Sequence, residues 1–356
     1  MHTLAFFSVH YSLKQFINLG VVDIMNKKKV TIKDVAKAAG VSVTTVSQAL
    51  NGNGSRFSPR TIKRIQRAKE KLGYEPDYFA QRMIMKKSKM IGVLVPDITN
   101  PFFNSLVRGI ENVLYQYDFM TMLCNADMDQ GKEDRYLTEL THRGVDGFII
   151  ASSSISNEAI QKILRGEKFP FIVLDQKKSE GISDAVLTDD FSGGQQAAQH
   201  LWDLGHRQVA VVMPENATEN IQNRLRGFQT VFGEDEIVRV DAELSKKSGR
   251  KAAQAVINSP ATAIFAVNDQ IALGLYLGLA DQGCRIPEDY SVIGYDNIDM
   301  CEYVVPQLTT IAQPIFELGQ TTAKMLIDRI EKPNKQWEEE LLPVQLVKRF
   351  STARLN

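Results

Sequence analysis

The sequence contains few of the side chains that form disulfides, hold metals or perform catalysis. Its 356 residues include only three cysteines, Cys124, Cys284 and Cys301, which are far apart and form no C-x-x-C pair. Five histidines are present, and none of them has metal-ligand spacing. This composition argues against a disulfide framework or a zinc site and is typical of a reducing cytoplasm. We therefore expect a cytoplasmic protein without a metal or a cofactor.

Long apolar runs and enzyme motifs are missing as well. No segment approaches the roughly 20 apolar residues that a helix needs to cross a bilayer, so no membrane association is expected. The chain has no G-x-G-x-x-G after a strand, no G-x-x-x-x-G-K-[ST] phosphate loop and no G-x-S-x-G nucleophile elbow. His206, in "LGHRQVAVV", is more typical of a capping or packing group than of a catalytic base. The sequence therefore does not predict an enzyme.

The first 24 residues carry a short apolar patch but no basic segment before it and no small-residue cleavage site after it. We expect them to be an extension that is not translated, with synthesis starting at Met25.

Charge of one sign is concentrated at one end of a chain whose net charge is zero. Residues 25–89 contain 16 Lys and Arg against 4 Asp and Glu, whereas residues 90–356 contain 25 against 37. A basic segment joined to an acidic body indicates a nucleic-acid-binding module attached to a different domain.

Three short helices are predicted within residues 25–73. Thr31, with Asp34 three residues later, forms a capping-box pattern, and Gly40 supplies the stop. Ser42 can cap a second helix, and Ser58-Pro59 starts a third. Apolar residues at helical spacing would face inward: Ile32, Val35, Ala36, Ala39, Val46, Ala49, Leu50, Ile62, Ile65, Ala68 and Leu72. A helix, a tight glycine turn and another helix predict a helix-turn-helix domain.

The second of these helices has short hydroxyl, amide and methyl groups on its outward face, which suit base edges and thymine methyls in the major groove. Flanking Lys and Arg, such as Lys63 and Arg64, would neutralise phosphates. An ordinary three-helix bundle is the alternative interpretation. The predicted DNA-binding residues are Thr31, Ser42, Val43, Thr44, Thr45, Ser47, Gln48, Asn51 and Ser58.

From residue 90 onward, short apolar runs that end in polar residues alternate with amphipathic stretches, as in "MIGVLVPD" followed by "NSLVRGIENVLYQY". This pattern predicts doubly wound parallel sheets, and the length predicts two lobes with a break near residues 188–194. In such sheets ligands bind at the carboxyl ends of strands. Polar residues follow the predicted strands at Asp97, Asp127, Asp175, Asn268, Asp269 and Asp296.

Carboxylates at strand ends, without a nucleophile or a phosphate loop, are typical of a site for a polyhydroxylated ligand. The carboxylates would accept hydrogen bonds from its hydroxyl groups. The "NPFF" segment at residues 100–103 adds aromatic faces that can pack on the C–H side of a sugar ring. A helix start with a buried Phe pair explains that segment equally well.

The segment "VTIKDVAKAAGVSVTTVSQALNG" resembles the N-terminal signature of the LacI/GalR family of bacterial transcription regulators, and the resemblance extends to about residue 355. It implies a DNA-binding domain at 25–73 and a hinge at 74–89, in which Ala80 and Met83 contact the minor groove. Met83 stands where the family usually has a wedging leucine. The remaining residues, 90–356, would form a periplasmic-binding-protein-like domain of two lobes, about 90–188 plus 314–340 and about 189–313 plus 341–353.

The resemblance also implies a small sugar effector that releases the repressor from its operator. Its ligand residues would be Asn100, Phe102, Phe103, Asp175, Arg224, Asn268, Asp296 and Gln313. "ITNPFF", "VLDQ" and "IGYDNIDM" are most similar to the ribose-operon repressor branch, which makes ribose the expected effector. Two positions depart from that branch: Gln176 stands where ribose binders often have Arg, and Leu244 where many have an aromatic.

Two alternatives remain open on the sequence alone. One is a catabolite-control regulator that answers to a phosphorylated carrier protein, since "NGN" after the second helix occurs in that branch. The other is a sugar-binding receptor without a role on DNA. Because the chain ends without the leucine heptad of family tetramers, the resemblance implies a homodimer on a near-palindromic operator.

Overall fold

The computed structural model divides into two units, Met1–Lys87 and Ser88–Asn356. It describes residues 30–50, 54–75, 88–151, 160–165, 169–174 and 183–355. The predictions for Asn51, Ala80, Met83 and Asp175 concern residues outside these ranges.

The first unit contains helices α2 (Ile32–Ala39), α3 (Val43–Leu50) and α4 (Pro59–Leu72) and the short 3₁₀ helix η1 (Gly54–Arg56). Their first residues are capped as the sequence predicts. Asp34 accepts hydrogen bonds from the Thr31 backbone at 2.8 Å and from its hydroxyl at 2.7 Å, while Ser42 and Ser58 accept from the backbone three residues later. Val35, Ala36, Ala39, Val46, Ile65, Ala68 and Tyr74 form the buried core of this unit.

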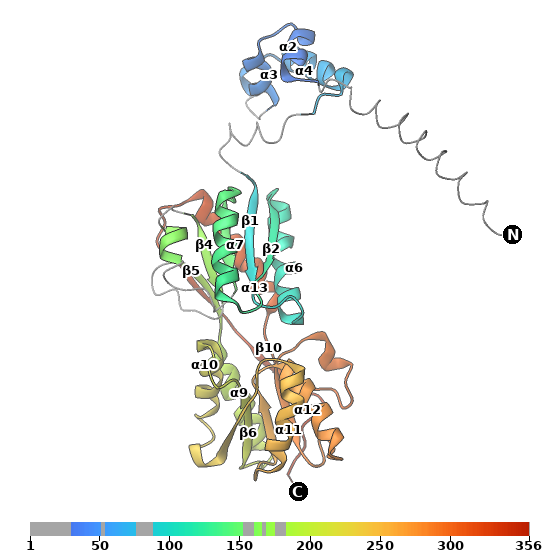
Figure 1. Cartoon of the computed structure of the whole chain (residues 1–356), viewed down its shortest axis with the longest axis vertical. Helices are drawn as coiled ribbons and strands as arrows, with labels where there is room; N and C mark the ends of the chain where they lie inside the picture. The colour runs from blue at the N-terminus through green and yellow to red at the C-terminus, as the bar shows by residue number, and fades with distance from the viewer. Residues whose placement is uncertain are drawn as a thin grey trace, which may run out of the picture. The chain divides into compact units, whose positions relative to one another are not determined.

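The second unit contains two sheets, which define two lobes (Figure 1). Lobe 1 has the strand order β11-β5-β4-β3-β1-β2. Its strands are β1 (Met90–Val95), β2 (Met120–Asn125), β3 (Gly147–Ile150), β4 (Phe171–Leu174), β5 (Asp184–Thr188) and β11 (Glu339–Leu342). They associate with helices α6 (Pro101–Gln116), α7 (Gln130–His142) and α13 (Ile315–Glu331) and the short π-helical segment η2 (Ile160–Arg165).

Lobe 2 has the order β12-β10-β9-β8-β6-β7. Its strands are β6 (Val209–Met213), β7 (Ile237–Asp241), β8 (Ala263–Ala266), β9 (Ser291–Asp296), β10 (Thr309–Ala312) and β12 (Gln345–Val347). Its helices are α9 (Asp190–Asp203), α10 (Glu219–Phe228), α11 (Lys246–Ile257), α12 (Asp269–Asp281), η3 (Glu234–Glu236) and η4 (Asp299–Glu302).

The sheets are parallel, as predicted, with one difference: β12 pairs antiparallel with β10. Among the described strands this is the exception, and it lies at a sheet edge, where the chain can reverse without a crossover helix. β11 ends at Leu342, slightly beyond the expected lobe boundary at residue 340.

The chain passes between the lobes after β5, after β10 and between β11 and β12. Because the strands of each sheet are parallel and in register, for example Val95 opposite Asn125 in lobe 1, their carboxyl ends share one edge. Those edges face each other across the crossings (Figure 1). Such an edge is where parallel α/β sheets bind ligands.

Candidate DNA-binding and effector sites

Helix α3 presents a mostly uncharged polar surface. Ser42, Val43 and Thr44 are exposed, and Thr45, Ser47 and Gln48 are half-buried, while Val46 is completely buried against α2 and α4. The side chains predicted to meet bases therefore lie on the accessible side of α3. Their contact with DNA stays a prediction. So does that of Thr31, whose hydroxyl donates to Asp34, and that of Ser58, whose hydroxyl caps α4.

The neighbouring elements α2, η1 and α4 carry exposed basic side chains. They are Lys33, Lys37, Arg56, Arg60, Lys63, Arg64, Arg67 and Lys71. Arg64 also has a structural partner that the sequence did not predict. Its Nη2 donates to the carbonyl of Gly40 over 3.3 Å, bracing the turn between α2 and α3. Gly40 adopts φ 61°, a left-handed conformation that residues with a Cβ adopt only at a cost.

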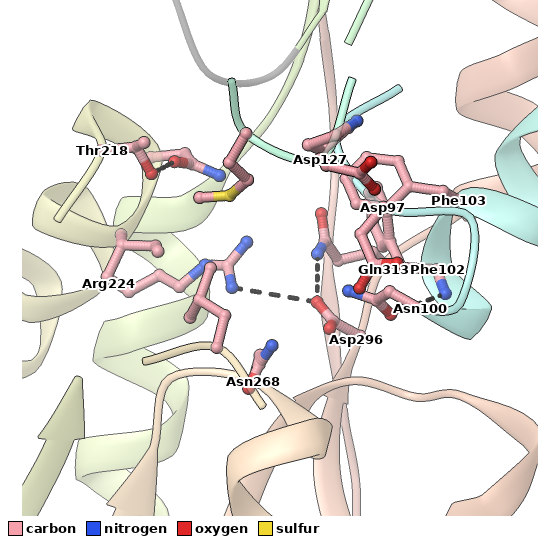
Figure 2. Close-up of a pocket in the computed structure, with 15 residues that line it drawn as sticks. Asp97, Asn100, Phe102, Phe103, Asp127, Thr218, Arg224, Asn268, Asp296 and Gln313 are labelled. Atoms are coloured by element: carbon pink, nitrogen blue, oxygen red, sulfur yellow. Dashed lines mark hydrogen bonds and ion pairs between the residues drawn. The ribbon is translucent and has the colours of Figure 1, made fainter. Parts of the chain in front are cut away.

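A cavity of about 370 Å³ lies between the lobes at the carboxyl ends of the strands (Figure 2). The described residues of the predicted effector site all line it: Asn100, Phe102, Phe103, Arg224, Asn268, Asp296 and Gln313. The structure thus brings together residues from five different loops and helices of two lobes.

Lobe 1 contributes the aromatic side chains of this cavity. Asn100 caps α6, since its Oδ1 accepts from the backbone of Phe102 at 3.1 Å, which leaves the Nδ2 group as a donor. Phe102 and Phe103 follow in the first turn, with their rings edge to face at 5.1 Å between centroids. A proline at the first helical position and a capping Asn make this start of α6 well defined.

Lobe 2 contributes a buried cation held by two carboxylates. Arg224 of α10 donates from Nε to Asp190 at 2.7 Å and from Nη1 to the carbonyl of Val267 at 2.7 Å. Its Nη1 also lies 3.8 Å from Oδ1 of Asp296. The guanidinium packs over the Tyr295 ring, 3.7 Å from its centroid. With only 4% of the Arg224 side chain exposed, these contacts fix the orientation of its remaining N–H groups toward the cavity.

Asp296 occupies a strained position. Its φ is 119°, which residues other than glycine rarely adopt, and such conformations persist where the surroundings hold them. Here Gln313 donates from Nε2 to Oδ1 of Asp296 at 2.7 Å, and Thr188 donates to Oε1 of Gln313 at 2.9 Å. These bonds orient one carboxylate and one amide at the bottom of the cavity (Figure 2).

Asn268 and Asp269 are adjacent after β8, but their side chains point to different parts of the fold. Asn268 lines the cavity and caps α12 by accepting from Ile271 at 2.9 Å. Asp269 instead points into lobe 2, where it accepts hydrogen bonds from Thr310, the Cys301 thiol and the Ile298 backbone. Burial raises the pKa of Asp269 to about 6 and also raises the pKa of the Cys301 thiol. Asp269 is therefore a brace for the loop after β9 and not a ligand residue.

Several cavity residues were not among the predicted ligand residues. Pro96, Asp97, Asp127, Met128, Thr218, Asn220, Ile221 and Leu244 also line the cavity. The sequence identified Asp97 and Asp127 as strand-end carboxylates. For Thr218 and Asn220 the one available signal is that β6 ends shortly before them. Met128 follows Asp127 in two successive left-handed residues, φ 57° and 54°, which no local sequence signal predicted.

Comparison with known proteins finds a match for each of the two units. Residues 31–77 match the model of bacterial regulatory proteins of the lacI family, and residues 198–352 match a periplasmic binding protein-like domain. The HTH-type transcriptional regulator DegA of Bacillus subtilis (strain 168) is 35% identical over 337 residues, which cover 92% of this chain and 99% of the relative. This chain belongs to the LacI family.

Two solved structures are more similar in sequence to this LacI-family regulator. Both are LacI family transcriptional regulators with bound ribose, from Enterococcus faecium (57% identity) and Enterococcus faecalis V583 (61% identity). Each match covers 75% of this chain and 100% of the solved chain, with a TM-score of 0.72.

Family membership makes the protein a DNA-binding transcription regulator and not an enzyme. In the described part of the chain, no helix is long and apolar enough to cross a membrane. Within the same residues, no group of three or more His, Cys, Asp or Glu could hold a metal ion.

Proposed function

We propose that this LacI-family regulator is a cytoplasmic repressor of a ribose-utilisation operon, which binds a near-palindromic operator as a homodimer and is released by ribose. The observation that carries the proposal is the cavity in which Arg224, Asp296 and Gln313 are fixed opposite Asn100 and the Phe pair. The ribose-bound relatives at 57% and 61% identity support the choice of sugar.

The polar groups of the cavity suit vicinal hydroxyls. Asn100 and Asn268 each use the amide oxygen as a helix cap and keep an N–H₂ group to donate. The Asp296 carboxylate lies beside Arg224 and can accept hydrogen bonds from sugar hydroxyls, so the site offers both donors and acceptors. The volume of about 370 Å³ is at the small end of the range for ligand cavities, about 300–1,000 Å³, as suits a monosaccharide.

The charge of the lining favours a neutral ligand. The described lining residues include three carboxylates, Asp97, Asp127 and Asp296, and one cation, Arg224, which already contacts Asp190 and Asp296. Lys132, which is not among the lining residues, forms an ion pair with Asp127. A sugar phosphate would bring two negative charges to a site with a surplus of carboxylates. We therefore place free ribose ahead of a phosphorylated sugar.

Exposed apolar side chains support a homodimer. Tyr115, Met120 and Leu123 are exposed on α6 and on β2, the edge strand of lobe 1, and Met300 and Tyr303 are exposed around η4 of lobe 2. Where such side chains form a contiguous patch, they mark a contact surface. A two-fold dimer would present two copies of α3 to two half-sites.

Release follows from linkage. Ribose contacts both lobes, so it binds one lobe arrangement more tightly than others, and an operator that prefers a different arrangement is bound less tightly when ribose is present.

The test is fluorescence anisotropy of the purified protein on labelled DNA from upstream of its own gene, titrated with ribose, arabinose, xylose, glucose and ribose 5-phosphate. We expect specific binding that ribose weakens and the others do not. Asp296→Asn should keep operator binding and lose the ribose response. Asp235→Asn changes an exposed aspartate of lobe 2 and serves as the matched control. Specific binding that no free sugar alters would refute the ribose proposal.

The second candidate, a catabolite-control regulator, predicts a different outcome of the same experiment. Binding would then be unaffected by sugars and tightened by a phosphorylated carrier protein. If the protein were a receptor without a role on DNA, no specific operator binding would be found. The exposed polar face of α3 argues against this hypothesis.

A further inference from the structure

The first residues of the second unit are fixed to a distant carboxylate. Asp146, just before β3, accepts three hydrogen bonds from residues 88–89: from the Ser88 backbone at 2.7 Å, the Ser88 hydroxyl at 3.0 Å and the Lys89 backbone at 2.9 Å. The Asp146 backbone in turn donates to the carbonyl of Met90 at 2.8 Å. Charge-assisted bonds to one carboxylate are stronger than ordinary backbone bonds. The chain is therefore held at the point where it enters lobe 1.

Lys89 adds a second attachment. Its φ of 54° is left-handed, and its Nζ donates to the carbonyl of Tyr117 at 3.0 Å and lies 4.2 Å from the centre of the Phe119 ring. Its own carbonyl accepts from Met120 at 2.7 Å. Tyr117 directly follows α6, so Lys89 connects the end of this helix to the start of β1. We call Ser88, Lys89, Asp146 and Tyr117 the entry clamp.

The entry clamp and the cavity lie at opposite ends of the same two elements. β1 begins one residue after Lys89 and ends next to Pro96 and Asp97, which line the cavity. α6 begins at the cavity with its cap Asn100 and its Phe pair, and ends at the clamp. Six strand residues span about 20 Å, and the 16 residues of α6 span about 24 Å. Figure 1 shows β1 and α6 in lobe 1.

α6 is closely packed against its neighbour α13. It crosses α13 at Gly109 and Gly319, where a Cβ would lie 2.1 Å from the Phe316 carbonyl oxygen and 2.3 Å from the Leu106 carbonyl oxygen. Gln320 also donates to Asn112 across this contact at 3.0 Å. Closely packed helices shift as rigid bodies and deform little. A displacement at the cavity end of α6 is thus carried to Tyr117.

We propose that the entry clamp transmits occupancy of the cavity to the DNA-binding unit, with Asp146 as its positioning residue. Residue 88 is covalently attached to the segment that leads to the helix-turn-helix. While the clamp holds residues 88–89, a shift of β1 and α6 changes the position and direction from which that segment leaves lobe 1. Without the clamp, residues 88–89 lose these side-chain attachments and the shift is not passed on to that segment. The proposal rests on the function proposed above, in which a cavity ligand alters operator affinity.

The test separates binding from coupling in the full-length chain. Ribose affinity is measured by calorimetry, and operator affinity by anisotropy with and without saturating ribose, for the wild type, Asp146→Asn and Asp146→Ala. In the wild type we expect ribose to weaken operator binding by about 10- to 100-fold, the range of ordinary allosteric coupling. In Asp146→Ala we expect a change below about twofold, with ribose affinity within about twofold of the wild type because the cavity is at the other end of β1. Asp146→Asn keeps one acceptor oxygen and should fall in between.

Milder variants guard against a misfolded Asp146→Ala. Ser88→Ala removes one bond to Asp146, and Lys89→Met removes the bond to Tyr117, so each should reduce the ribose-induced change by several-fold. Asp118→Asn is the matched control: Asp118 is exposed in the turn after α6, and asparagine tolerates its left-handed φ of 59°. It should behave as the wild type does.

The outcomes are distinct. A wild-type protein whose operator affinity ignores ribose overturns the proposed function, and the clamp proposal with it. A wild type that responds, alongside folded variants that respond equally, overturns the clamp proposal alone. If ribose affinity in Ser88→Ala and Lys89→Met falls together with the ribose-induced change in operator affinity, the substitutions cause a general loss of structure. That result would also overturn the clamp proposal.

Discussion

The Thr188 hydroxyl donates a hydrogen bond of 2.9 Å to Oε1 of Gln313, a residue 125 positions away. Thr188 is the last residue of β5 in lobe 1, and Gln313 directly follows β10 in lobe 2. The bond therefore joins two of the three segments at which the chain passes between lobes. It also selects the orientation of the Gln313 amide, whose Nε2 then points at Asp296.

We predict that Thr188→Val weakens both the fold and the effector site. Valine has the same shape but no donor, and the nearly buried Oε1 of Gln313 would lose its partner, which costs about 1–2 kcal/mol in free energy of unfolding. The amide could then flip away from Asp296, so ribose affinity should fall by about fivefold, or about 1 kcal/mol. Urea denaturation and calorimetry measure the two effects.

Thr138→Val is the control for this substitution. Thr138 is exposed on α7, and its hydroxyl donates to the Asp134 carbonyl of the same helix. Neither the unfolding free energy nor ribose binding should change measurably. Unchanged ribose affinity in Thr188→Val would show that Gln313 is oriented by other contacts.

The ion pair between Asp190 and Arg224 supports a second prediction. Each side chain is 4% exposed, and the pair is 2.7 Å long. Asp190→Asn leaves a buried guanidinium with one carboxylate fewer, which should cost about 3 kcal/mol of stability. Because Arg224 then turns toward Asp296, ribose affinity should fall by about tenfold or more.

An exposed pair on the same helix provides the comparison. Glu219 contacts Arg226 at 2.8 Å, with 38% and 52% of the two side chains exposed. Solvent screens such pairs, so Glu219→Gln should leave the denaturation midpoint and ribose affinity unchanged. An equal effect of the two substitutions would contradict the role given to burial.

The sequence predicted the cavity through one rule, that polar residues after buried parallel strands meet at one edge. Asn268 follows the buried strand β8, Asp296 is the last residue of the buried strand β9, and both line the cavity. The same rule was wrong for Asp269, because a residue one position further along points to the other side of the chain. The local sequence pattern does not reveal that Thr310 and Cys301 donate hydrogen bonds to the Asp269 carboxylate.

Other features depended on contacts that are distant in sequence. β7 and β11 are edge strands with one buried residue each, and they lack the long apolar run that marked the central strands. The sequence placed Asp190 near an expected lobe boundary and gave it no role in the site. Its ion pair with Arg224, 34 residues later, depends on the packing of α9 against α10. Such pairings become visible once the chain is folded.

Protonation of His200 provides a third prediction. Its Nε2 lies 2.9 Å from the Thr352 hydroxyl, and burial lowers the pKa of His200 to about 4. Between pH 6.5 and 4 the unfolded chain binds a proton that the native imidazole does not, so stability falls as the pH falls. At pH 5 this loss is about 2 kcal/mol. Asp269, with its raised pKa, acts in the opposite direction between pH 4 and 6.

The two effects are separated by comparing variants. His200→Gln keeps a group that can bond to Thr352 and removes the titration, so the decline of unfolding free energy from pH 7 to pH 5 should become shallower by about 2 kcal/mol relative to the wild type. Asp269 contributes equally to both proteins and cancels. His142→Gln, at an exposed position on α7, should leave the decline as it is. Parallel pH curves for the wild type and His200→Gln would exclude His200 as the source.

The DNA-binding unit supports the last prediction, which contrasts a side chain of α3 with one of α4. Gln48 is half-buried on α3, and its amide can bond bidentately to adenine, so Gln48→Ala should relax base preference at one operator position by about 1–3 kcal/mol.

Lys63 is exposed on α4, and Lys63→Gln should weaken binding to every sequence alike and reduce the slope of log affinity against log salt by about one. Anisotropy on single-base operator variants at three salt concentrations measures both. Unchanged base preference in Gln48→Ala would mean that α3 is not the reading helix. An unchanged salt slope in Lys63→Gln would place the phosphate contacts on the other exposed basic residues.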